Sequence, residues 1–399
     1  MDFDFSEEWI FVWLLMSNSE LLRIKNEQKT LLKNKRLQAV IKKHNIRPND
    51  RFGLKENFSK LHENPIIFVS LLNNKKVKMD YDINKKKAGQ PLVSFVIFFE
   101  DDDAGKLQKC VDSVLRLSLR QEEREVFVIG DGTREPLVLL LNGSDDDVVV
   151  VRQPSSGINS AMNLGMRMAT GRYVQFLSAA DTLLLDGYGH CLDMMRYEKP
   201  EIIVFESSRD EKQRTSYEDG KMESGTEFMR HNTINPSPAG YAFRKNLTEG
   251  MTFDTANESS DEEFTVLLFL KAEKVLPTTA VARFKGKDRQ TAGGDDKKTV
   301  IKKLDDQYAM ICRLHDMAYA MPVDDRLAIE RRVAQMTMSY ILAVVKDLRS
   351  AKQLRTRIEQ LEEKGLFPLP DKRYNKKYTI FSKLVKRKLV RDLALKLLE

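Results

Sequence analysis

Acidic side chains follow three of the segments that the sequence predicts as strands. These side chains are the run 100–103, Asp131 and Asp181. Because the carboxyl ends of strands in an open α/β sheet line a common crevice, we expect these carboxylates at one edge of the sheet. Carboxylate oxygens are ligands for divalent cations, so this edge could bind such an ion. Alternatively, the run 100–103 is a solvated acidic loop without a ligand.

The elements that must position these groups include a helix and a strand between residues 157 and 177. Small or apolar residues at 158, 161, 162, 165, 168 and 169 have the spacing of a helix with one buried face. Thr170 and Gly171 end that helix, and 173–177 alternates like a strand. Further strands are expected at 93–99, within 125–133, which also includes the turn after that strand, and at 148–151 and 201–205, with helices around 107–115 and 261–272. This alternation predicts an α/β fold with a doubly wound sheet.

The segment 157–181, GINSAMNLGMRMATGRYVQFLSAAD, resembles the family 2 glycosyltransferases of the GT-A fold. The usual form there is close to GLSAARNxGLxxATGxYIxFLDSDD. Matching positions are Gly157, Ala161, Asn163, Gly165, Ala169, Thr170, Gly171, Tyr173, Phe176, Leu177 and Asp181. The resemblance extends over roughly residues 92–390. It implies a bacterial cell-envelope or capsule type of enzyme that transfers sugar from a nucleotide sugar with inversion.

The same resemblance implies a nucleotide site. Asp131 matches the family's aspartate that reads the base, and Gly132 keeps the following turn open. Asn163 is the third residue expected at this site. The first aspartate of the family's DDGS turn is Gly130 here. Alternatively, Asp131 only caps a turn.

The family's divalent cation, Mn or Mg, is bound by a DxD motif, which falls on Ser178 and Ala180 here. Alanine has no ligand atom, and serine offers only a neutral oxygen. Asp181 is therefore the remaining ligand in this turn. Asp101 and Asp102 could reach a cation from the other side.

The general base is implied by the family pattern HEDEEF, which reads Ser259-Ser260-Asp261-Glu262-Glu263-Phe264 here. Asp261 is the candidate base for an acceptor hydroxyl, and Glu262 is the second choice. Alternatively, Asp261 is a carboxylate that only stabilises the start of a helix.

We expect three regions. Residues 1–90 form a largely helical extension that could dock a partner; it has an aromatic run at 9–16 and a basic helix from Ser19 to about His44. Residues 91–290 form the GT-A domain. Residues 291–399 form a helical region that ends in a basic amphipathic helix within 371–399. Such a helix could lie on anionic lipid, or dock on the protein with its lysines solvated.

Composition limits the compartment and the partners. The chain of 399 residues has a net charge of +7 and three cysteines, which have neither zinc-ligand nor disulfide spacing. The chain has no apolar run long enough to span a bilayer, and its first residues are too acidic for a signal peptide. We expect a cytoplasmic protein, with contact to the inner face of the membrane through the last helix. No motif indicates a nucleic-acid partner.

Two functions remain open. The first is a transferase that takes a UDP- or GDP-linked sugar to a glycan or lipid-linked acceptor, in cell-envelope polysaccharide or glycoprotein assembly. The second is an inactive GT-A module that acts as a scaffold or glycan-binding subunit of a partner glycosyltransferase. The second hypothesis arises because the departures from the family concentrate at polar positions. These are Gly130, Met162, Ser178, Ala180, Ser259 and Ser260.

Overall fold

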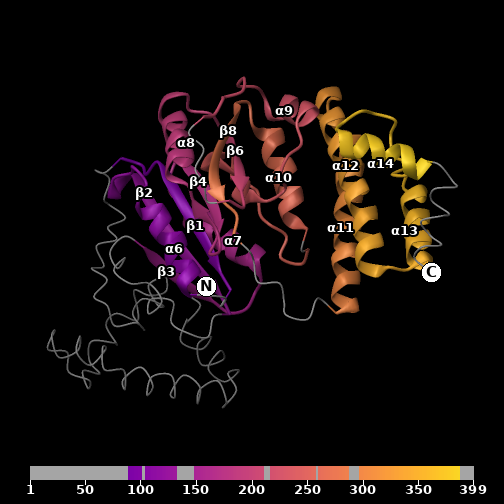
Figure 1. The fold of residues 1–399 in the computed structure, drawn as a ribbon, viewed down its shortest axis with the longest axis horizontal. Helices are drawn as coiled ribbons and strands as arrows, with labels where there is room; N and C mark the ends of the chain where they lie inside the picture. Colours follow the sequence, from indigo (N-terminus) through magenta and orange to yellow (C-terminus); the bar gives the residue numbers. More distant parts are fainter. Residues whose placement is uncertain are drawn as a thin grey trace, which may run out of the picture. The chain divides into compact units, whose positions relative to one another are not determined.

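The computed structural model describes residues 89–100, 104–132, 148–210, 216–257, 259–286 and 296–386 (Figure 1). The predictions for the N-terminal extension fall outside these residues. So do Asp101 and Asp102, and the last part of the basic tail.

One mixed sheet organises the described part of the chain. Its strand order is β3-β2-β1-β4-β7-β6-β8-β5. The strands are β1 Val93–Phe99, β2 Arg124–Asp131, β3 Val149–Gln153, β4 Tyr173–Ser178, β5 Thr182–Leu183, β6 Ile202–Ser208, β7 Tyr241–Arg244 and β8 Val275–Phe284. The first four pair in parallel, whereas β7 is antiparallel to both β4 and β6.

Helices cover both faces of the sheet (Figure 1). The α-helices of the described residues are α6 Ala104–Leu115, α7 Ile158–Met168, α8 Leu185–Tyr197, α9 Gly225–His231, α10 Ser260–Lys271, α11 Lys297–Ala318, α12 Val323–Ala343, α13 Ala351–Glu363 and α14 Lys376–Lys386. Side chains of α6 and α8 share one apolar cluster with one face of the sheet, and those of α7 and α10 share another with the opposite face. The predicted α/β architecture is confirmed.

The glycines of the 157–181 segment allow α7 to pack closely on the sheet. A Cβ added at Gly165 would lie 2.1 Å from Cγ1 of Val96 on β1. At Gly171 an added Cβ would lie 2.6 Å from Oγ of Ser94. The carboxylate of Glu125 binds the turn between α7 and β4, accepting from the amide of Thr170 at 2.9 Å and from its hydroxyl at 2.5 Å. These contacts explain why the turn needs threonine followed by glycine.

The helices after residue 296 share the core behind α7 and α10. Leu304 and Ile311 of α11 and Ile341 of α12 belong to the same cluster as Phe176 of β4 and Phe264 of α10. Helix α12 contacts α9, and α11 contacts α10 (Figure 1). The helical region is thus joined to the α/β domain by continuous apolar packing.

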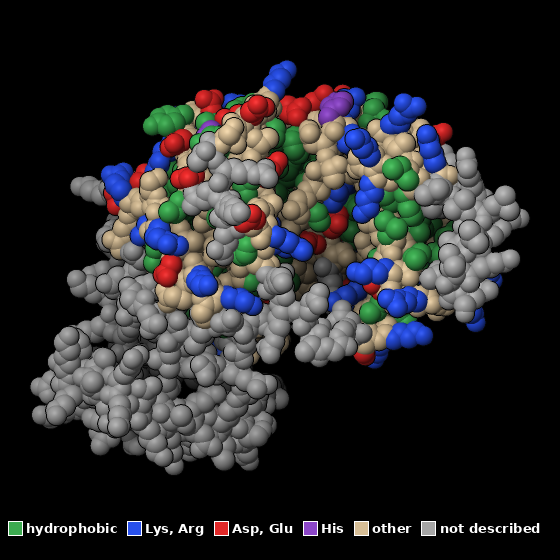
Figure 2. Space-filling view, in the orientation of Figure 1, with side chains coloured by type: hydrophobic (Ala, Val, Ile, Leu, Met, Phe, Trp, Pro, Cys, Tyr) green, Lys and Arg blue, Asp and Glu red, His purple; other side chains and the backbone are tan. Residues whose placement is uncertain are grey.

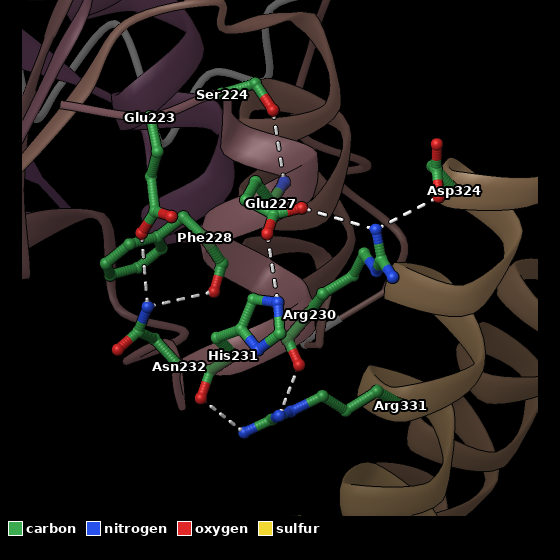
Figure 3. A network of polar contacts seen from close by, with 9 residues as sticks. All are labelled: Glu223, Ser224, Glu227, Phe228, Arg230, His231, Asn232, Asp324 and Arg331. Atoms are coloured by element: carbon green, nitrogen blue, oxygen red, sulfur yellow. Dashed lines mark hydrogen bonds and ion pairs between the residues drawn. The ribbon is translucent and has the colours of Figure 1, made fainter. Parts of the chain in front are cut away.

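A polar joint fixes α12 to α9 (Figure 3). The buried guanidinium of Arg331 donates to the carbonyl oxygens of Arg230 and His231, the last residues of α9, and to that of Tyr374. It therefore satisfies carbonyls that the end of a helix leaves without intrahelical partners. Beside it, Arg230 pairs with Asp324 on α12 at 3.0 Å.

We predict that Arg331→Met lowers the free energy of unfolding by about 2–4 kcal/mol, because buried carbonyls lose a charged donor. Arg326→Met is the matched control: it lies on the same helix, and its ion pair with Glu330 is 3.8 Å long and exposed. Urea unfolding should show a change of less than about 1 kcal/mol for the control. Equal effects of the two substitutions would contradict the role of the joint.

Candidate functional site

A cavity of about 310 Å³ opens where the carboxyl ends of β1 and β4 meet. This is the edge at which open α/β sheets bind ligands. Its wall comes from both strand ends, from α7, from the segment before β7, from the start of α10 and from the end of β8. The charged residues of the wall are Glu100, Lys106, Asp181, Asp261, Arg283 and Lys285.

The turn after β4 is held together by Asp181. This carboxylate is almost fully buried and accepts a hydrogen bond from the amide of Ser178 at 3.2 Å. Its Oδ2 also lies 3.4 Å from Nη1 of Arg283, and the two side chains are 4% and 2% exposed. A buried carboxylate needs such a partner, since an isolated one costs several kcal/mol. The guanidinium of Arg283 therefore compensates the buried negative charge of Asp181.

Strand β8 brings Arg283 to this turn. Thr182 and Leu183, which follow the turn directly, pair antiparallel with Phe284 and Arg283. Nε of Arg283 donates to Oγ of Ser207 on β6 at 3.1 Å, which fixes the guanidinium from a second strand. The arginine is thereby held rigidly beside Asp181.

The described residues do not form a divalent-cation site of the expected kind. Position 180 is alanine, Oγ of Ser178 accepts from the amide of Ala180 at 3.3 Å, and Asp181 is paired with Arg283. Among the described residues, no group of three His, Cys, Asp or Glu side chains could hold a metal ion. A divalent ion would have to compete with the guanidinium of Arg283 for the single carboxylate of Asp181.

Asp261 reaches the cavity from the first turn of α10. Burial, followed by the neighbouring charge of Glu262, raises the pKa of Asp261 to about 6. The backbone amides of Glu262 and Asp261 and the guanidinium of Arg332 act in the opposite direction. Carboxylates of this kind, poised near neutral pH in a cleft, are typical of general bases.

Glu262 turns away from this role. It forms an ion pair of 2.7 Å with Nη2 of Arg332 on α12, and it does not line the cavity. Nη1 of the same arginine donates to the carbonyl oxygen of Ile234 at 3.2 Å. Arg332 thus connects α12 both to the start of α10 and to the segment before β7.

Asp131 stabilises the loop before α7. Its carboxylate accepts from the amides of Ser156 and Gly157 at 2.8 and 2.9 Å, and from the side chain of Gln153 at 2.9 Å. Gly132 has φ +64, and an added Cβ there would lie 2.9 Å from Cβ of Ser155. The glycine is needed both for its conformation and for this close approach.

Asn163 binds backbone rather than facing the cavity. Its amide nitrogen donates to the carbonyl oxygen of Phe253, and its oxygen accepts from the amide of the same residue, both at 2.8 Å. One turn earlier, Asn159 donates to the carbonyl oxygens of Asp254 and Asn257. These two asparagines fasten α7 to the segment that leads into α10.

The cavity brings together Asp181 and Asp261 of the predicted site residues, together with positions 178 and 180. Asp131, Gly132, Asn163 and Glu262 are not part of its wall. The sequence analysis missed the basic residues Lys106, Arg283 and Lys285. A signal existed in the β-branched run before Arg283, which indicates a strand that ends in Arg-Phe-Lys.

We predict that Asp261→Asn stabilises the protein above neutral pH. The folded-state pKa is raised from 3.8 to about 6, so ionisation costs stability as pH rises from the first value through the second. The gain of the variant over the wild type should be near zero below pH ~4 and reach about 3 kcal/mol above pH ~7.

Urea unfolding at several pH values measures this gain. Asp193→Asn is the control, because that side chain on α8 is 57% exposed. The control should change stability by less than about 0.5 kcal/mol at all pH values. A pH-independent effect of Asp261→Asn would contradict the buried environment of the carboxyl.

Comparisons with known proteins agree with this geometry. The family model described as Glycosyl transferase family 2 matches residues 94–254. Chondroitin synthase of Pasteurella multocida (strain Pm70) is 29% identical over 109 residues, which are 27% of this chain and 11% of the synthase. The uncharacterized glycosyltransferase EpsJ of Bacillus subtilis (strain 168) is 29% identical over 94 residues, 23% of this chain and 26% of that protein. The matched segment therefore spans a minor part of each relative.

Among solved structures, S. aureus TarS 1–349 in complex with UDP has a TM-score of 0.54 at 11% identity, covering 76% of this chain and 88% of that one. This likeness concerns the fold. Together with the family match, it supports a glycosyltransferase domain of family 2 over residues 94–254, within a GT-A fold. The resemblance of segment 157–181 is thereby confirmed. At the turn after β4, this chain has Ser178 and Ala180, with Arg283 beside them.

Proposed function

We propose that the protein transfers a sugar from a UDP- or GDP-linked donor to a hydroxyl of a glycan or lipid-linked acceptor. The observation that carries the proposal is the position of Asp261, whose pKa is raised to about 6 and which lines the cavity at the strand ends. TarS has been solved with UDP, and the matched Pasteurella relative is a chondroitin synthase. The first supports a nucleotide-linked donor, and the second supports a glycan acceptor.

In this reaction the acceptor oxygen attacks the anomeric carbon while its proton passes to the carboxylate of Asp261. The bond to the nucleoside diphosphate breaks, and the diphosphate leaves on the opposite face, which inverts the anomeric centre. With a pKa of about 6, the base is mostly ionised at neutral pH and still strong enough to take the proton. The resemblance implies Mn or Mg as a cofactor, for which the turn offers only the Arg283-paired carboxylate of Asp181.

Titration of the full chain with UDP, GDP and their sugars by calorimetry tests the proposal. We expect binding with a Kd in the micromolar range for one nucleotide, corresponding to about 8 kcal/mol. Asp261→Asn should keep this binding and lose sugar transfer to an envelope-glycan acceptor by at least about a hundredfold. Full activity of this variant would remove Asp261 from the mechanism. If none of the nucleotides binds, the proposed donor site is contradicted.

A second candidate is an inactive GT-A module that serves as scaffold or glycan-binding subunit of a partner glycosyltransferase. The observation that favours it is the replacement of the family's acidic positions by Ser178 and Ala180. The same titrations distinguish the two. Silence with nucleotides, together with co-purification of a second transferase, supports the scaffold, whereas nucleotide binding with turnover contradicts it.

We further propose a peripheral membrane contact through the C-terminal helix. Lysines at 376, 377, 383 and 386 lie on the sequence of α14, and Figure 2 shows basic side chains spread over the helical region. None of the helices in the described ranges is both long and apolar enough to span a bilayer. Each basic residue close to anionic lipid contributes about 1 kcal/mol.

Sedimentation with vesicles tests this contact. The full chain should bind vesicles that contain phosphatidylglycerol, and far less those of phosphatidylcholine alone. Exchange of Lys376, Lys377 and Lys383 for glutamate should weaken the binding by at least about tenfold, since favourable charges are reversed. The control exchanges Lys352, Lys364 and Lys274, which lie outside α14. Equal loss in both variants would contradict a specific role of α14.

A further inference from the structure

We propose that basic side chains, namely Arg283, Lys285 and Lys106, hold the diphosphate of the donor in place of a divalent metal ion. This inference rests on the proposed function, because its ligand is a nucleoside diphosphate. All three residues line the cavity formed at the carboxyl ends of β1 and β4.

Polar atoms of the turn 178–181 already have partners within the protein. Asp181 binds the amide of Ser178 and pairs with Arg283, and Oγ of Ser178 accepts from the amide of Ala180. A metal ion would have to displace the guanidinium from a side-chain pair that is 2% and 4% exposed. The cation buried beside Asp181 is therefore the guanidinium of Arg283.

The second step concerns the direction of β8. Side chains two residues apart in a strand lie on the same face, so Lys285 follows Arg283 toward the cavity. The amide of Lys285 donates to the carbonyl oxygen of Ser208 at 2.7 Å, which continues the strand pairing past Phe284. An added Cβ at Gly286 would lie 1.9 Å from the carbonyl oxygen of Ala180, so the backbone passes directly over the turn. Both residues thus line the same wall of the cavity, with Arg283 buried and Lys285 exposed.

Lys106 is the third cation of the cavity wall. Lys106 belongs to the first turn of α6, which follows β1 after a short connection, and it is half-buried. Arg283 balances Asp181, and the two lysines are the other cations of a wall that also carries Glu100 and Asp261. Lysine binds phosphate oxygens as a compact point charge, and preorganised cations stabilise a leaving group as it gains charge. Together these residues can perform the electrostatic task of a metal site, which the described residues do not form.

Calorimetry on the full chain, freed of metal by a chelating resin, tests the inference with UDP and with inorganic pyrophosphate as probes. Each titration is done with and without manganese. We expect the metal-free affinity for UDP to lie within about twofold of the affinity with manganese. Lys285→Ala and Lys106→Ala should each weaken binding of both probes by about tenfold.

Matched controls lie on the same elements. Lys274→Ala directly precedes β8, at the other end of the strand from Lys285, and Lys109→Ala is on the exposed side of α6. Both should leave the affinities within about twofold of the wild type. The variants at Lys285 and Lys106 leave the pair of Asp181 and Arg283 unchanged. The test therefore does not require an Arg283 variant that folds.

The outcomes separate this inference from the proposed function. Binding of UDP that needs manganese and ignores both lysines overturns the inference and leaves the proposed function standing. Lysine-dependent binding of pyrophosphate without any nucleotide binding supports the basic anion site and contradicts the donor function. If neither UDP nor pyrophosphate binds, with or without manganese, both the inference and the proposed function are overturned.

Discussion

A charge buried at the end of a strand must be balanced where it lies, and the pair of Asp181 and Arg283 meets this requirement. The rest of the cavity depends on it. To bring the guanidinium to the turn, β8 must run alongside the short strand β5 and continue over Ala180. The same path delivers Lys285 to the cavity. One electrostatic constraint thus explains the position of the last long strand and the basic character of one wall.

A comparable constraint governs Asp261. It gains its elevated pKa from burial, and Arg332 limits how far that pKa rises. Because Arg332 belongs to α12, the pKa of Asp261 is set partly by a helix outside the sheet. Its neighbour Arg331 secures the same helix to the end of α9. Through these two arginines, the helical region helps to fix the geometry of the site.

Much of the fold could be predicted from local pattern. The strand at 93–99 is a continuous apolar run, and α7 shows the spacing of one buried face, so both are determined by residues close in sequence. Asp261 could be found because its motif is local and matches a family. The importance of Arg283 could not, because an arginine in a strand gains its meaning from a carboxylate about a hundred positions away. Likewise, the bonds of Asn163 to Phe253 connect segments that no local pattern relates.

The buried arginine also constrains how this turn can change. An aspartate introduced at 178 or 180 would share the cavity with the cations Arg283 and Lys285. Loss of Arg283 alone would leave Asp181 buried without its charge partner. A metal-binding turn of the family's kind would therefore need acidic residues at 178 and 180 together with the removal of Arg283. The side chains of this turn are thus coupled, so that each can be exchanged only in combination with another.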